Sequence, residues 1–113
     1  MNTVDVVSVD PSTLLVATLV QDTAGDLLST GEFGAVGDGK YFTLVQPNNT
    51  NSIHLASWDL EPPFKKSIFP LLTTIVDGGY ADGMLVGLDE NEDGVYFARI
   101  DPTSGACVDK TML

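Results

Sequence analysis

The residues with the clearest chemical potential lie in one acidic stretch near the C-terminal end of the chain. Asp89, Asn91 and Asp93 alternate with other residues and are followed by Gly94. This spacing matches the first half of a calcium loop, in which alternate side-chain oxygens converge on the ion. The position where a helix-flanked calcium loop needs a bidentate glutamate is Ile100. Two interpretations therefore stay open, a calcium site at these three residues and an ordinary acidic hairpin tip.

A second group contains the residue types of a hydrolase triad, namely His54, Ser57 and Asp59. Side chains alternate between the two faces of a strand, so His54 is predicted to point away from the other two. Because triad catalysis requires mutual hydrogen-bond reach, we predict no catalytic residues in the chain and no cofactor other than the candidate calcium ion. The chain has no second histidine for a metal pair, and its single cysteine, Cys107, excludes a cysteine-based zinc site.

The segments that carry these residues have the composition of strands. Residues 84–88 and 95–100 are rich in β-branched and aromatic residues and enclose the acidic turn, which predicts a hairpin. Residues 14–20, 64–72 and 106–113 are predicted as further strands, the second of them at an exposed edge. Four glycines are predicted to form turns: Gly31, Gly34, Gly37 and Gly39.

Composition sets bounds on the class of protein and on its partners. A length of 113 residues, 43% of them hydrophobic, suits one globular domain. The formal net charge of −11 makes nucleic acid and membrane surfaces poor partners, because both are anionic. The single cysteine favours a reducing compartment such as the cytoplasm.

Internal similarity is the strongest organising signal. The segments DGKYFTLV and DGMLVGLD begin at Asp38 and Asp82, an offset of 44 residues. A second pattern recurs as VVSVDP, LASWDL and FARIDP, whose aspartates are Asp10, Asp59 and Asp101. We therefore predict copies near residues 1–33, 38–77 and 82–113, and we expect each aspartate to end a strand by accepting hydrogen bonds from downstream amides.

Alignment on these aspartates predicts which residues share a face of the strand. One face is predicted to hold the columns Val7, Ala56, Ala98 and Val9, Trp58, Ile100, and the other the column Val6, Leu55, Phe97. Both faces are apolar over much of the strand. The alignment therefore predicts a strand that is buried on both sides.

Residues 93–105, DGVYFARIDPTSG, resemble the blade repeats of quinoprotein-like and YVTN-type β-propellers. A repeat of about 40 to 50 residues with three or four strands also has the size of a propeller blade. The predicted fold is all-β, with antiparallel hairpin repeats that make about two and a half blades. A compact β-sandwich or β-barrel is the alternative.

The expected role follows from a repeat without a convergent catalytic set. We predict a non-catalytic module that binds protein or assembles with itself, because an incomplete set of blades leaves apolar faces uncovered. The expected partners are further copies of the chain, as a homo-oligomer, or the remaining blades of a longer chain. The alternative is part of a propeller enzyme whose catalytic residues lie outside residues 1–113.

Overall fold

The computed structural model describes residues 4–22, 27–47, 52–71 and 75–113. Over these residues the protein is all-β, with antiparallel sheets of two, four and four strands, so the predicted fold class is confirmed. Within the same residues no helix is long and apolar enough to cross a membrane.

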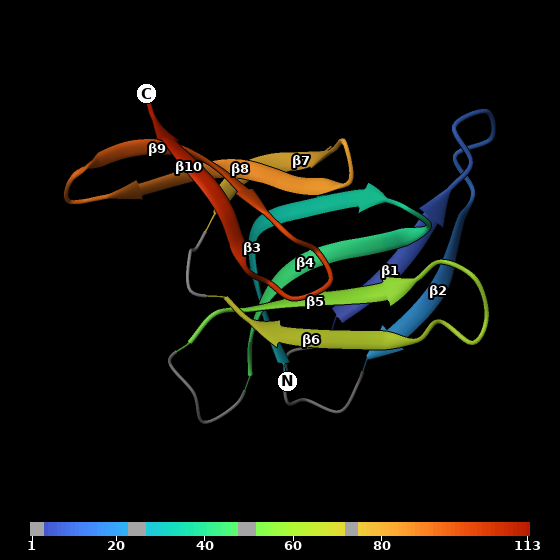
Figure 1. Cartoon of the computed structure of the whole chain (residues 1–113). Coiled ribbons are helices and arrows are strands. Elements are labelled where there is room, and N and C mark those ends of the chain that lie inside the picture. The colour runs from blue at the N-terminus through green and yellow to red at the C-terminus, as the bar shows by residue number, and fades with distance from the viewer. Residues whose placement is uncertain (1–3, 23–26, 48–51, 72–74) are drawn as a thin grey trace.

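The strands form an N-terminal hairpin, a central sheet and a C-terminal sheet (Figure 1). In both larger sheets, strands that follow one another in sequence are neighbours. The hairpin contains β1 (Val4–Val9) and β2 (Val16–Asp22). The central sheet contains β3 (Leu27–Gly37), β4 (Lys40–Pro47), β5 (His54–Asp59) and β6 (Lys66–Pro70). The C-terminal sheet contains β7 (Val76–Ala81), β8 (Met84–Asn91), β9 (Gly94–Ile100) and β10 (Cys107–Met112).

The central sheet is covered on both faces. Its face toward the C-terminal sheet contributes Phe42, Leu44 and Leu55 to one apolar cluster, where they meet Leu85 and Ile100. Its opposite face contributes residues to a second cluster that includes β1 of the hairpin. The members of this second cluster are Val6, Val45, Ala56 and Trp58. The four residues from Leu55 to Trp58 are all buried, so the prediction of a strand buried on both sides is confirmed for β5. It is wrong for β1, where Val7 and Val9 are exposed, and for β9, where Phe97 is exposed, because each of these strands has one face that no other sheet of the described residues covers.

The two four-stranded sheets pair their middle strands in the same register. Leu44 lies opposite Leu55 in the central sheet, and Leu88 lies opposite Phe97 in the C-terminal sheet. The other shared pairs keep the same offsets, as Tyr41 with Trp58, Phe42 with Ser57 and Thr43 with Ala56 correspond to Leu85 with Ile100, Val86 with Arg99 and Gly87 with Ala98. A side chain and its counterpart therefore occupy the same position in the two sheets.

The first turns of the two sheets also have matching backbones. Asp38 and Asp82 have φ of 51° and 52°, and the glycines that follow them, Gly39 and Gly83, have φ of 70° and 77°. Positive φ at both central residues is the requirement of the tight hairpin turn that Asp-Gly supplies. The offset of 44 residues seen in the sequence thus joins two turns of the same geometry.

Three predictions of local structure were wrong. The strand predicted over residues 64–72 is β6, which begins at Lys66 because Phe64 has a φ of 56° and precedes the strand. The second strand begins at Val16 and not at residue 14, because Leu14 has a φ of 60° and lies in the turn. Gly31, Gly34 and Gly37 lie within β3 and not in turns. Gly37 has a packing role there, since a Cβ at this position would lie 2.1 Å from the ring of Tyr80 on β7.

Candidate functional site

The aspartates that end β1 and β9 share one turn geometry. The amide of Asp10 donates to the carbonyl oxygen of Leu15, and that of Asp101 to Ala106, both at 2.9 Å. Each carboxylate accepts a hydrogen bond of 2.8 Å from the amide two residues downstream, that of Ser12 or Thr103. The Thr103 hydroxyl also donates to Asp101, and these hydrogen bonds lower the pKa of the Asp101 carboxyl. The carboxylates at both positions stabilise the turn, as predicted.

Asp59 makes the same backbone connection with a different carboxylate partner. Its amide donates to the carbonyl oxygen of Lys65 at 3.0 Å, which closes a turn one residue longer than the other two. Its carboxylate forms an ion pair of 2.5 Å with Lys40, the residue directly opposite on β4. The aspartate therefore keeps its position at the strand end, although its side chain is held by another strand.

The predicted calcium ligands lie around the β8–β9 turn with partners from the protein. Asp89 is buried and forms an ion pair of 2.5 Å with Lys110 on β10. The side-chain oxygen of Asn91 accepts a hydrogen bond of 2.8 Å from the amide of Asp93. Among the described residues, no group of three or more His, Cys, Asp or Glu side chains could hold a metal ion. Calcium binding at Asp89, Asn91 and Asp93 stays a prediction.

The register places His54 on the face of β5 opposite that of Ser57 and Asp59, as alternation predicted. His54 has its Nδ1 atom 3.4 Å from the carbonyl oxygen of Ser52. Ser57 is buried beside a cavity of about 160 Å³, where Pro102 and Thr103 of the C-terminal sheet also lie. Asp59 is paired with Lys40 instead. The turn that follows β9 therefore lies against the central sheet at Ser57.

The outer face of the C-terminal sheet is the side that points away from the central sheet. The register places Val86, Leu88, Phe97 and Arg99 on this face, with Asp109 of β10 opposite Arg99. Val86 and Leu88 are half-buried, whereas Phe97 is exposed. We define these five residues as the outer face.

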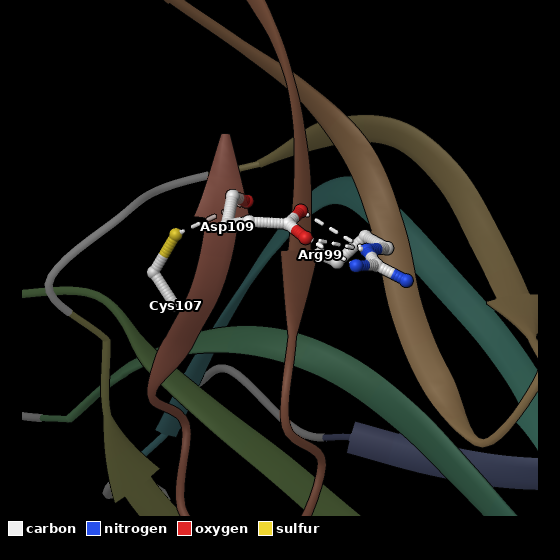
Figure 2. Close-up of polar contacts among 3 residues, drawn as sticks. All are labelled: Arg99, Cys107 and Asp109. Carbon is white, nitrogen blue, oxygen red and sulfur yellow. Dashed lines mark hydrogen bonds and ion pairs between the residues drawn. The ribbon is translucent and has the colours of Figure 1, made fainter. Parts of the chain in front are cut away.

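An ion pair borders the apolar part of the outer face (Figure 2). Arg99 Nε donates to both carboxylate oxygens of Asp109, at 3.0 and 3.1 Å, and its Nη2 contacts the same group. The interaction lowers the pKa of Asp109 and raises that of Arg99. Cys107 lies on the far side of Asp109, where its thiol donates to the Asp109 backbone oxygen at 3.5 Å. Because the two charges are paired, covering them with an apolar surface costs less free energy than covering either charge alone.

The sequence alone did not predict the ion pairs, which require knowledge of strand register. Lys40 and Asp59 could have been matched, because they flank the aligned hairpin at corresponding ends. Arg99 and Asp109 could not, since their pairing depends on a β-bulge between Cys107 and Asp109 that no sequence pattern marks.

No family model, curated protein or solved structure matches this chain. The resemblance to propeller blades therefore stays a prediction, and the functional argument rests on the geometry of the sheets.

Proposed function

We propose that this protein is a non-catalytic β-repeat module that binds other copies of itself by stacking one sheet on another, in the manner of propeller blades. The observation that carries the proposal concerns Val6, Leu55 and Phe97, each four residues before a strand-ending aspartate. Val6 and Leu55 are 3% and 1% exposed because the next sheet in the chain covers them, whereas Phe97 is 40% exposed. The outer face is thus the surface on which a further sheet would pack.

The opposite end of the stack has the complementary surface. Trp58 and Ile100, each one residue before its aspartate, are fully buried against the preceding sheet. Their counterpart in the hairpin, Val9, is exposed. Val7 on the same strand and Val16, which lies opposite Val9 on β2, are also exposed. In the central and C-terminal sheets, the face that meets the preceding sheet is therefore apolar and buried. The equivalent face of the hairpin is also apolar, but it is exposed.

Another copy of the chain supplies a surface that fits the outer face. Within one chain, the turn at Pro102 and Thr103 lies beside Ser57, the counterpart of Arg99. The hairpin has the same turn pattern at Asp10, so in head-to-tail stacking its acidic turn would approach Arg99 of the neighbouring copy. Contact between two different surfaces is heterologous, so it adds copies until a ring closes or, where the rotation between copies does not close, extends as a filament.

Light scattering coupled to size exclusion over a dilution series tests the proposal. The wild type is expected to show a mass above 12.0 kDa that falls toward the monomer on dilution. Phe97→Glu should remain monomeric, because it places a charge in the contact. Val36→Glu, at an exposed valine of the central sheet, should behave as the wild type. A wild type that is monomeric throughout, or an association unchanged by Phe97→Glu, would contradict the proposal.

The head-to-tail arrangement makes a sharper prediction for mixtures. Val9→Glu should also be monomeric, because it blocks the hairpin surface and leaves the outer face intact. A mixture of Phe97→Glu and Val9→Glu retains one working surface of each kind, so it should form a dimer and stop there. Failure of the mixture to associate, or growth beyond the dimer, would exclude this arrangement.

A further inference from the structure

The free edge of β1 is a position that is occupied in both larger sheets. β5 ends at Asp59, and β1 and β9 end one residue before the aligned aspartates Asp10 and Asp101. β5 and β9 are third strands, with a neighbour on each side. Among the described residues, β1 pairs with β2 alone, which corresponds to the fourth strand. Within the part of the chain that the structure describes, the hairpin therefore has the second half of a four-stranded unit, and no strand pairs with the side of β1 equivalent to the β4 and β8 positions.

The edge strands of the larger sheets carry features that hinder pairing with another chain. In β3 and β7 the feature is a bulge, between Ser29 and Gly34 and between Val76 and Gly79, whereas the only charged residue of β1 is Asp5. β6 begins with Lys66 and ends with Pro70, and β10 contains Lys110, residue types that hinder pairing with another chain. β1, with the sequence VDVVSV, contains neither lysine nor proline. The irregularity beside Val7 places its extra residue, Leu19, in β2, so β1 itself runs without interruption.

We propose that this edge of β1 binds an antiparallel strand from a partner protein, and that the strand has the chemistry of β4. β4 and β8 occupy the corresponding position in one register, which predicts that the residue equivalent to Phe42 lies opposite Ser8. Backbone hydrogen bonds of the added strand would supply affinity, and its alternating apolar side chains would supply specificity.

Charge selects the β4 type over the β8 type. In the central sheet, the first residue of β4, Lys40, lies opposite Asp59 and forms an ion pair with it. The equivalent first residue of β8 is Met84, which has no charge. A strand with lysine at this position would approach Asp10, whose carboxylate also accepts a hydrogen bond from the Ser12 amide. A chain of net charge −11 attracts a basic strand more than a neutral or acidic one.

A synthetic peptide with the sequence of residues 38–47, DGKYFTLVQP, provides the probe. Binding is measured by NMR on the full chain carrying Phe97→Glu, so that association through the outer face does not contribute. The amide signals of β1 should shift, while those of β6 and β10 should not. Absence of binding, or shifts confined to another edge, would overturn the proposal. Either result is independent of the mass of the wild type, which tests the proposed function.

Register is tested by disulfide crosslinking in the same variant with Cys107→Ser. Protein carrying Ser8→Cys should crosslink to a peptide carrying Phe42→Cys at least tenfold more than to one carrying Val45→Cys. Asp10→Lys should weaken binding of the original peptide, and the peptide substitution Lys40→Glu should restore it. Equal crosslinking of the two peptides, or no rescue by the charge exchange, would show that the strand does not bind in this register.

Discussion

The central and C-terminal sheets pair their middle strands identically, yet they differ in exposure. Leu55 and Phe97 occupy the same position, opposite Leu44 and Leu88, but only Leu55 is buried. The central sheet has a layer on each side, whereas the described residues provide the C-terminal sheet with one neighbouring layer. Leu55 is buried because layers cover both faces of the central sheet, and Phe97 is exposed because no layer of the described residues covers the outer face.

A second comparison concerns the aspartates that end β5 and β9. Asp59 and Asp101 make equivalent backbone hydrogen bonds, but one carboxylate pairs with Lys40 and the other binds Thr103. The position of the aspartate is thus common to the sheets, while its side-chain partner varies. Repetition of the residue therefore reflects the turn it forms and needs no ligand to explain it.

The largest expected effect comes from truncating Leu44 and Leu88, which occupy equivalent positions in the two sheets. Leu44→Ala removes a fully buried side chain from between two sheets and should destabilise the protein by about 2–5 kcal/mol. Leu88→Ala affects a half-buried side chain and should cost the monomer about 1 kcal/mol. Chemical denaturation at low protein concentration measures both. Equal losses would break the distinction between the two sheets.

A glycine and its counterpart give the next effect. Gly37→Ala forces the sheets apart at Tyr80 and should cost about 1–3 kcal/mol. The position 44 residues later is Ala81, which is exposed, so Ala81→Gly is the matched control and should cost under about 1 kcal/mol. Thermal unfolding followed by circular dichroism compares them. A Gly37→Ala variant as stable as the wild type would mean that this contact does not hold the sheets together.

Acid should weaken the turn that the Asp101 carboxylate stabilises. The pKa of Asp101 is lowered in the folded state, so its contribution to stability is present above the unfolded value of about 3.9 and is lost as the pH falls through the folded value. Asp101→Asn keeps an oxygen acceptor and loses the titration. Its melting temperature should therefore decline less steeply than that of the wild type below about pH 4. Parallel declines would contradict the assigned role of this carboxylate.

The smallest expected effect is calcium binding at the β8–β9 turn. Isothermal titration should give weak binding in the wild type and none in Asp93→Ala. Lys110→Met should strengthen it, because it releases Asp89 from its ion pair. Asp38→Ala, in a turn outside the proposed loop, is the control and should bind as the wild type does. No heat in either the wild type or Lys110→Met would end the calcium hypothesis.

Sequence reasoning predicted the parts of the fold that local pattern determines. The column through Val6, Leu55 and Phe97 followed from alternation, and the turn at Gly39 followed from its residue type. The same reasoning failed where a distant contact decides the structure. Gly37 was predicted as a turn residue from its type alone. Its packing partner, Tyr80, lies 43 positions away in the sequence, so no local pattern indicated the contact.

The candidate site was predictable only in part. Phe97 was assigned to the correct face, but alternation gives no sign of whether another layer covers that face. Which face of each sheet meets the next depends on how the three sheets stack, and this arrangement is set by contacts between distant segments.

The central claim is tested most directly by the solvent accessibility of two leucines. Methyl-labelled protein is examined by NMR with a soluble paramagnetic agent at low and high protein concentration. Leu44 is expected to be protected at both concentrations, whereas Leu88 is expected to be accessible in dilute protein and to become protected as copies associate. A Leu88 signal that is equally accessible at both concentrations would contradict the central claim.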